Sequence, residues 1–204
     1  ALDRFGRAVG SAAAPDALPL PHWAFFLPCP TDAEVGPDGH PLRGGFLPPV
    51  TLPRRMFAAA RIAFEAPLDI GESGRLISTI ADVRLKCGSS GDLVFVEVDR
   101  ILDQGGRVRV RERQTFVYRD IGDAVPMPTP GAVPPSGEVW QPGSVNLFRF
   151  SAATFNGHRI HYDEPYATEV EGYPALVIHG PFTAARLAAL AMRDGALAEF
   201  EFRA

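Results

Sequence analysis

Leu93-Val94-Phe95-Val96-Glu97-Val98 is the stretch that decides the fold class of this 204-residue chain. It lies in a segment, 93–102, in which apolar and polar residues alternate as they do in a half-buried β-strand. Three further segments alternate in the same way, at 61–66, 74–86 and 107–118. Turn sequences at 89–91 and 103–106 separate neighbouring segments. Consecutive strands joined by tight turns predict an antiparallel meander.

Two blocks rich in proline and glycine flank the meander, at 30–53 and 120–143. The first is predicted to be irregular, and a loop of this length inside a compact domain is often a lid or a binding loop. The second is typical of an extended linker between domains. Ahead of the first block, residues 2–14 form a weak helix pattern. The apolar, proline-bounded segment 21–28 is expected to fill the core or to form one wall of a ligand channel.

The region after the linker predicts a second unit with a different pattern. Residues 145–150 alternate like a strand, and 182–192 have strong helix propensity, with Leu187, Leu190 and Ala191 expected on the core face. Another strand is expected from residue 198. These few elements cannot close a domain, so we expect at least two further strands in the whole protein. The predicted division is 1–120 for a first unit, 121–143 for a linker and 144–204 for a second unit.

Composition excludes several classes of protein. The net charge is -4 and charged residues make up 22%, which is too mild a balance to indicate nucleic-acid binding or a charged membrane surface. No apolar run approaches the roughly 20 residues that span a bilayer, and the start of the sequence lacks the pattern of a signal peptide. The two cysteines do not suggest a disulfide framework. We therefore expect a cytoplasmic protein.

The chemistry is concentrated in Phe155-Asn156-Gly157-His158-Arg159-Ile160-His161-Tyr162-Asp163. His161 is the strongest catalytic candidate, because an imidazole takes up and returns a proton near neutral pH. Asn156 can hold a water molecule or orient the ring, but it cannot act as a base. Asp163 is expected to cap a helix predicted at 164–170.

Two other interpretations of this segment stay open. His161 can be a satisfied buried histidine with a structural role only. The spacing His158-x-x-His161-x-Asp163, with His179 nearby, has some metal-ligand character. It matches no established metal signature, so the sequence predicts neither a metal nor a redox cofactor.

Gly180 follows His179 and opens the strongest predicted helix. The first backbone N–H groups of a helix have no partner within the helix, and the helix dipole favours negative charge there. A glycine lets a ligand carbonyl approach closely. Such a position can polarise a carbonyl and stabilise an enolate, although Gly180-Pro181 can also be a plain turn before a helix.

Together these segments resemble the MaoC-like (R)-specific enoyl-CoA hydratase and dehydratase family. That family carries a motif of the type S-x-D-x-N-P-x-H-x-D, followed by a small-residue H-G segment that opens a central helix. On this chain the motif histidine corresponds to His161 and the helix-opening glycine to Gly180. The motif aspartate corresponds to Asn156, so this chain lacks that carboxylate. The remaining motif positions, serine, asparagine, proline and trailing acid, fall on Thr154, His158, Arg159 and Asp163.

The resemblance is most specific over 148–182, where the chain is similar to a branch with mesaconyl-CoA and itaconyl-CoA hydratases and mitochondrial-type 3-hydroxyacyl-thioester dehydratases. It implies an α+β double hotdog, in which antiparallel sheets each wrap, or once wrapped, a central helix. The first unit would be a degenerate hotdog that shapes the acyl and CoA channel, and the second would be catalytic. The resemblance also implies a homodimer.

The implied activity is reversible hydration of a 2-enoyl-CoA without a cofactor, and a branched dicarboxylic acyl group is one candidate substrate. His161, Asn156 and Gly180 are the expected catalytic residues. Expected substrate-binding residues, for CoA phosphates or a substrate carboxylate, are Arg54, Arg55, Arg159 and His179. Two alternatives remain, an acyl-CoA thioesterase and a non-enzymatic thioester-binding subunit.

Overall fold

The structure is a computed structural model that describes residues 1–11, 18–88, 91–122, 126–127, 131, 136 and 138–204. Four long strands form the predicted body, and their bounds are β1 Arg54–Phe64, β2 Arg75–Gly88, β3 Gly91–Gln104 and β4 Arg107–Arg119. The fifth strand, β5, is Glu199–Arg203. The α-helices are α1 Leu2–Ala8, α2 Ser144–Thr154 and α3 Gly180–Ala191. Shorter helical turns are η2 Pro21–Ala24, η3 Asp32–Glu34, η4 Arg159–His161, η5 Tyr166–Val170 and η6 Met192–Asp194.

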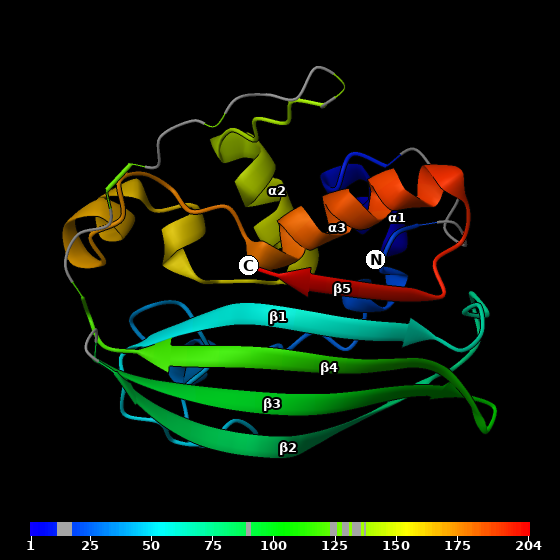
Figure 1. The fold of residues 1–204 in the computed structure, drawn as a ribbon, viewed down its shortest axis with the longest axis horizontal. Coiled ribbons are helices and arrows are strands. Elements are labelled where there is room, and N and C mark those ends of the chain that lie inside the picture. Colours follow the sequence, from blue (N-terminus) through cyan, green and yellow to red (C-terminus); the bar gives the residue numbers. More distant parts are fainter. Residues whose placement is uncertain (12–17, 89–90, 123–125, 128–130, 132–135, 137) are drawn as a thin grey trace.

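The strands form one antiparallel sheet in the order β2-β3-β4-β1-β5 (Figure 1). The predicted meander is confirmed, because β2 pairs with β3 and β3 with β4. The 103–106 turn is in place, whereas residues 89 and 90 of the other predicted turn lie outside the described residues. β5, from the predicted second unit, pairs with β1. The division at 121–143 stays a prediction, and much of that linker also lies outside the described residues.

The α-helices lie beside β1 and β5, at one edge of the sheet, and β2 forms the opposite edge (Figure 1). The main core lies between this helical layer and the sheet. It joins residues of α1, η2, β1, α2, α3 and β5, with Phe5, Ile62, Phe150, Phe182 and Ala185 almost completely buried. A smaller cluster around Val96 and Tyr118 lies under the 47–52 segment.

The prediction of a strand at 145–150 is wrong, because this segment forms α2. Its buried side chains, Leu147, Phe150 and Ser151, are spaced at three and four residues, whereas Val145 and Phe148 are exposed. That spacing is helical. The Gly143 N–H also donates a hydrogen bond to Asn146 Oδ1 at 3.0 Å, which caps the helix start.

The helix predicted at 182–192 is confirmed as α3, but its core face is not the predicted one. Phe182, Ala185 and Ala188 are buried, whereas Leu187 is 45% exposed. Small side chains let α3 pack closely, so alanines rather than leucines mark its buried face. The helix predicted at 2–14 is observed over Leu2–Ala8, and residues 12–14 lie outside the described part.

The segment 21–28 was expected either to fill the core or to form a channel wall. His22, Trp23 and Ala24 of η2 are buried in the core, which confirms the first role for this part of the segment. Phe25 and Phe26 line a cavity beside the loop after β1, so a role as a channel wall stays a prediction. Across the part of the chain that the structure describes, none of the helices has the length and apolarity to span a membrane.

Candidate active site

Four of the five histidines lie in one row, which we call the histidine row: His40, His158, His161 and His179. The ring centroids of His40 and His158 are 3.9 Å apart, and those of His161 and His179 are 3.6 Å apart. His158 meets His161 edge-on at 5.3 Å. The row thus joins the 155–163 segment to the start of α3, as the sequence predicts, and adds His40 from the N-terminal loop.

His161 ends the turn η4 and is 7% exposed. Its Nδ1 lies 2.7 Å from the carbonyl oxygen of Val177. A carbonyl can only accept, so Nδ1 carries the proton and Nε2 keeps a lone pair. The Val177 N–H in turn donates to the Ile160 carbonyl at 2.9 Å, which fixes the two segments against each other. His161 therefore presents Nε2 as a base.

The pKa of His161 is lowered to about 3, mainly by burial and also by the nearby His158 and His40, although the Val177 carbonyl opposes the shift. A positive charge on a buried ring loses its hydration, and a neighbouring imidazolium repels it. His161 is therefore neutral at pH 7, with its lone pair free to accept a proton.

His179 is fully buried immediately before α3. Its Nε2 lies 2.9 Å from Ser151 Oγ of α2, and its ring stacks on His161. Among the described residues, its Nδ1 has no hydrogen-bond partner. Burial lowers the pKa of His179, with the neighbouring histidines acting in the same direction. His179 thus packs against one face of the His161 ring and connects it to the start of α3.

Asn156 follows the end of α2, where Phe155 adopts a left-handed conformation with φ 50°. The side-chain oxygen of Asn156 accepts a hydrogen bond from the His158 N–H at 3.0 Å. This local turn fixes the start of the 156–163 segment. The amide nitrogen of Asn156 remains as the group that can bind a water molecule.

Gly180 is the first residue of α3 and lies against β1. A Cβ at this position would be 3.2 Å from Phe57 Cδ1 and 3.5 Å from Ala204 Cβ. The space beside the helix start is therefore too tight for a side chain without a shift of its neighbours. Since His179 both stacks on His161 and precedes Gly180, the base and the helix start lie next to each other.

The predicted arginines have several partners of their own. Arg54 is 4% exposed, donates to the Glu171 carbonyl and pairs with the Glu171 carboxylate at 3.6 Å. Glu171 also faces His158 Nε2 at 3.6 Å. Arg55 is buried beside His40, where its charge lowers the pKa of that histidine. Their proposed role in binding substrate stays a prediction.

Arg159 has contacts that tie segments together. Its guanidinium donates to Asp163 Oδ2 at 2.7 Å and to the Pro37 carbonyl at 3.1 Å, and it lies 4.0 Å from the Tyr166 ring centre. Asp163 Oδ1 also accepts from the Tyr166 N–H, so the predicted helix cap is confirmed. A substrate-binding role for Arg159 likewise stays a prediction.

The sequence indicates a possible lid or binding loop at 30–53, but it does not show that residues 36–40 lie against the 157–163 segment. The Arg159 N–H donates to the Asp38 carbonyl at 2.9 Å. A Cβ at Gly39 (φ 85°) would overlap the Gly157 carbonyl oxygen, so the approach depends on a glycine there. The string Pro37-Asp38-Gly39-His40 carries the only available signal, a turn sequence that ends in a histidine.

One set of possible metal ligands is present among the described residues. Donor atoms of Asp38, His40 and His158 all lie within 4.8 Å of one another. However, the His40 and His158 rings pack against each other with their centroids 3.9 Å apart, and His40 Nδ1 already lies 3.0 Å from Asp38 Oδ2. The Arg55 charge beside His40 also opposes a cation. The arrangement suits hydrogen bonding better than metal coordination.

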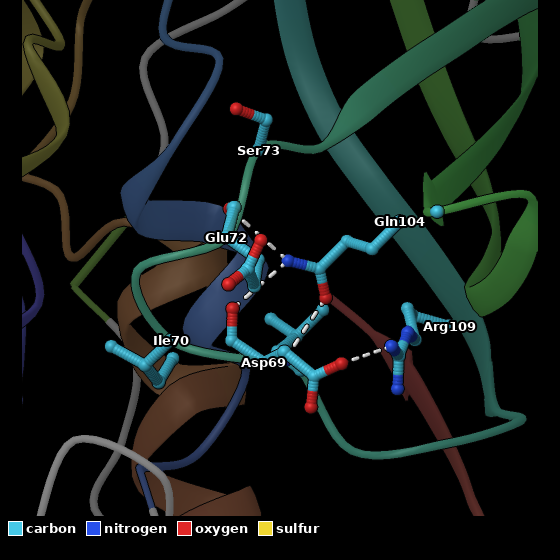
Figure 2. Close-up of a pocket in the computed structure, with 8 residues that line it drawn as sticks. Asp69, Ile70, Glu72, Ser73, Gln104 and Arg109 are labelled. Atoms are coloured by element: carbon cyan, nitrogen blue, oxygen red, sulfur yellow. Dashed lines mark hydrogen bonds and ion pairs between the residues drawn. The ribbon is translucent and has the colours of Figure 1, made fainter.

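Two cavities lie around the loop that follows β1 (Figure 2). This loop is at the end of β1 that is remote from the histidine row (Figure 1). The larger cavity has a volume of about 620 Å³. Figure 2 shows that its polar side chains bind one another: Gln104 bonds the backbone of Asp69 and Glu72, and Arg109 pairs with Asp69. Arg109 Nε has no hydrogen-bond partner among the described residues, but the other polar groups bond one another, so the candidate chemistry remains with the histidine row.

Two curated relatives are similar to this chain. Mesaconyl-C(4)-CoA hydratase from Chloroflexus aurantiacus is 49% identical over 177 residues, which cover 85% of this chain and 63% of that protein. Mitochondrial hydroxyacyl-thioester dehydratase type 2 from Schizosaccharomyces pombe is 24% identical over 189 residues, which cover 78% of this chain and 62% of that protein. The chain therefore spans less than two thirds of the length of these relatives.

Solved structures share the fold at low identity. HtdX from Mycobacterium tuberculosis has a TM-score of 0.63 and 17% identity, covering 99% of this chain and 76% of that one. A MaoC-like dehydratase from Phytophthora capsici has a TM-score of 0.60 and 14% identity, covering 95% and 70%. These likenesses concern the fold alone, and with the observed sheet and helices they confirm the predicted α+β class of the double-hotdog type.

The family match covers far more of the sequence than the short motif on which the resemblance was based. The model of a protein family described as hydroxyacyl-thioester dehydratase type 2 matches residues 20–204. It includes the sheet, the histidine row and α3. The chain therefore belongs to the hydroxyacyl-thioester dehydratase type 2 family.

Proposed function

We propose that the protein catalyses the reversible hydration of a 2-enoyl-CoA to a 3-hydroxyacyl-CoA. The observation that carries this proposal is the His161–His179–Gly180 arrangement. It places an imidazole with a free Nε2 lone pair beside the start of α3. A base next to a set of unpaired backbone N–H groups suits proton transfer coupled to the formation of an enolate.

In this proposal a water molecule held by the Asn156 amide attacks C3 of the enoyl thioester. His161 Nε2 accepts a proton from the water as the oxygen–C3 bond forms. The electron pair of the C2–C3 double bond moves towards the thioester carbonyl and gives an enolate. His161 then returns the proton to C2, so one water molecule is added and the enzyme regains its initial protonation state.

The Gly180 N–H, at the start of α3, would donate to the thioester oxygen and stabilise the enolate. Such a donor contributes about 10²–10³-fold to the rate, and a well-placed acid/base about 10²–10⁴-fold. His179 would act by holding the His161 ring, since its own side chain is fully buried. Arg54, Arg55 and Arg159 are carried forward as candidate groups for the CoA phosphates or a substrate carboxylate.

The acyl group is proposed from one of the two curated relatives, a mesaconyl-C(4)-CoA hydratase that is 49% identical to this chain. We therefore propose a branched dicarboxylic enoyl group as the first substrate to test. A role in fatty acid metabolism, a cytoplasmic location and a homodimer remain proposals. Light scattering of the full-length protein during gel filtration would test the homodimer.

An assay of the full-length protein tests the activity. Mesaconyl-CoA, itaconyl-CoA and crotonyl-CoA would be offered, and loss of the conjugated enoyl absorbance would be followed together with release of free thiol. We expect loss of absorbance without free thiol, and a rate lowered by about 10²–10⁴-fold for His161→Ala. Tyr162→Phe is the matched control, because Tyr162 is adjacent in sequence and exposed, and its hydroxyl bonds the backbone carbonyl of Gly157 rather than His161.

Either of two results would overturn the proposal. Free thiol with every substrate would identify an acyl-CoA thioesterase. Binding of acyl-CoA without turnover, by wild type and His161→Ala alike, would identify a thioester-binding subunit. The thioesterase is disfavoured because Asn156 cannot activate water as a carboxylate would.

A further inference from the structure

The loop at 36–40 is held against the candidate site by contacts that leave little freedom. The Arg159 N–H and guanidinium bind the Asp38 and Pro37 carbonyls, and Gly39 packs directly on Gly157. Within the loop, the Gly36 N–H donates to the His40 carbonyl at 2.7 Å. Because these contacts fix the loop backbone, the side chains of Asp38 and His40 have a defined position beside His158.

Asp38 and His40 form a carboxylate–imidazole couple. His40 Nδ1 lies 3.0 Å from Asp38 Oδ2, and the His40 N–H donates to Asp38 Oδ1 at 3.0 Å. Burial alone would raise the pKa of Asp38, but the hydrogen bonds and charge of His40 outweigh it and hold that pKa well below its usual range. The carboxylate is therefore ionised and accepts, so Nδ1 donates and Nε2 carries the lone pair.

His40 is mostly buried but not closed off, since its side chain is 19% exposed. Burial lowers its pKa to about 4, against the opposing effect of Asp38. Its ring stacks on His158, whose other neighbour in the row is His161. The couple is thus neutral on the imidazole at pH 7 and lies one ring away from the candidate base.

The two bases of the row differ in how well they can hold a proton. Protonated His161 would have only a neutral carbonyl at Nδ1, whereas protonated His40 would face an ionised carboxylate. A hydrogen bond to a charged partner is roughly twice as strong as one between neutral groups. His40 is therefore the group in the row best able to carry a proton during a reaction. Asn156, which occupies the position of a motif aspartate, cannot do so.

We propose that the Asp38–His40 couple is a second acid/base of the hydration site and takes the place of the motif aspartate to which Asn156 corresponds. This inference rests on the proposed function and refines it. His40 Nε2, in place of His161 Nε2, accepts the proton of the attacking water as oxygen bonds to C3 and the C2–C3 pair becomes the enolate. The proton then passes by way of His158, whose ring lies between the two, to His161 Nε2 and then to C2. Asp38 keeps its charge throughout, and no proton is gained or lost overall.

The test compares three variants of the full-length protein in the hydration assay, with circular dichroism and melting temperature as checks on folding. His40→Ala is expected to lower kcat/KM by about 10²-fold or more, as for the loss of a general base. Asp38→Asn keeps the imidazole but removes its charged partner, and it is expected to lower kcat with little change in KM. Glu34→Gln is the matched control, because Glu34 is in the same loop region and its carboxylate bonds Thr31 rather than a residue of the histidine row.

Rescue separates catalysis from a structural role. Added imidazole is expected to restore part of the activity of His40→Ala, increasing with the unprotonated fraction of imidazole as the pH rises. His40→Gln, which retains hydrogen-bonding capacity for the loop, provides a second variant if His40→Ala does not fold. It is expected to be as slow as His40→Ala.

Three outcomes would overturn the inference. Full activity of His40→Ala, with His161→Ala inactive, would leave the proposed function intact and remove His40 from it. A slow His40→Ala that imidazole does not rescue, together with an active His40→Gln, would mean that His40 only holds the loop. Loss of activity with a chelator, restored by zinc, would assign Asp38, His40 and His158 to a metal instead.

Discussion

Two buried groups of polar side chains differ in how far their partners satisfy them. In the first, which we call the Glu112 cluster, Glu112 Oε1 accepts from Trp23 Nε1 and from Gln114 Nε2, both at 2.8 Å. Its Oε2 faces Arg100 at 3.4 Å and His22 at 3.5 Å. Both carboxylate oxygens are thus occupied. The second group, the histidine row, contains rings that stack on one another and keep nitrogen lone pairs.

The number of free proton-accepting atoms decides whether each group can take part in chemistry. Glu112 surrounded by four partners joins β4, β3 and η2, and it has no lone pair to offer to a substrate. Burial would raise its pKa, but His22, Arg100 and Gln114 outweigh that effect, so the pKa is lowered and the group stays ionised. In the histidine row the pKa values of His40, His161 and His179 are all lowered, mainly by burial, which leaves these three rings neutral at pH 7. The occupied Glu112 carboxylate indicates a structural role, although the His22 ring nitrogens have no hydrogen-bond partner among the described residues. The free lone pairs of the histidine row, together with its lowered pKa values, indicate a chemical role.

The largest expected effect comes from the histidine row. His161→Ala should lower kcat/KM by about 10²–10⁴-fold, because it removes the acid/base of the proposed reaction. His22→Gln, in the Glu112 cluster, should leave the activity of the folded protein unchanged. Initial rates at several substrate concentrations would measure both. Equal losses in the two variants would break the distinction between the clusters.

The second effect concerns stability and should be confined to the Glu112 cluster. Glu112→Gln removes the charge that Arg100 and His22 face and places a donor against other donors, so we expect a loss of about 2–4 kcal/mol in unfolding free energy. Urea denaturation would measure it. The control is Asp99→Asn, whose exposed pair with Arg113 on the same sheet should contribute less than about 1 kcal/mol. A Glu112→Gln variant as stable as Asp99→Asn would contradict the structural role.

A third prediction concerns pH. The pKa values of His40 and His161 are lowered in the folded protein to about 4 and about 3, so the unfolded chain binds protons more readily. Stability should therefore be complete above about pH 6.5, the usual histidine pKa, and should fall as the pH decreases below it, by about 1.4 kcal/mol per pH unit for each histidine.

Denaturation at a series of pH values between 7 and 4.5 would measure this slope, which should be smaller in His161→Gln than in wild type. The fall should occur well above the range in which the Glu112 carboxylate is protonated. Stability that does not change over this interval would show that the histidine row is less buried than the structure indicates.

The smallest expected effect is at the helix start. Gly180→Ala keeps the backbone N–H but adds a Cβ beside the Phe57 ring, so we expect a loss of about 1 kcal/mol in stability from crowding. A decrease in kcat/KM of about tenfold should accompany it, because a shift of the N–H weakens its hydrogen bond to the enolate. Phe57→Leu combined with Gly180→Ala would relieve the crowding and should restore part of both.

Much of the fold could be predicted because its signals are local. The alternation at 74–86, 93–102 and 107–118 belongs to strands whose faces differ in exposure, and short turns set their pairing. The segment 145–150 misled the same reasoning, since Val145-Asn146-Leu147-Phe148 alternates like a strand while Leu147, Phe150 and Ser151 share a helical face. Six residues are too few to separate the two periods.

The candidate site was predicted in part. His161, Asn156, His179 and Gly180 lie within one short region of sequence, and the structure brings the two pieces of that region together. His40 could not be found, because nothing in the spacing of a proline- and glycine-rich loop says which distant segment it will contact.

The sequence by itself determined the meander, the strong helix α3 and a short region with the residues needed for proton transfer. These depend on periodicity and residue type, which act over a few neighbouring positions. Only the tertiary structure decided that β5 pairs with β1, that Gly39 meets Gly157, and that Val177 and Asp38 fix which nitrogen of His161 and His40 keeps a lone pair. Each of these depends on contacts between segments distant in the chain, where packing and hydrogen-bond partners, rather than local preference, select the arrangement.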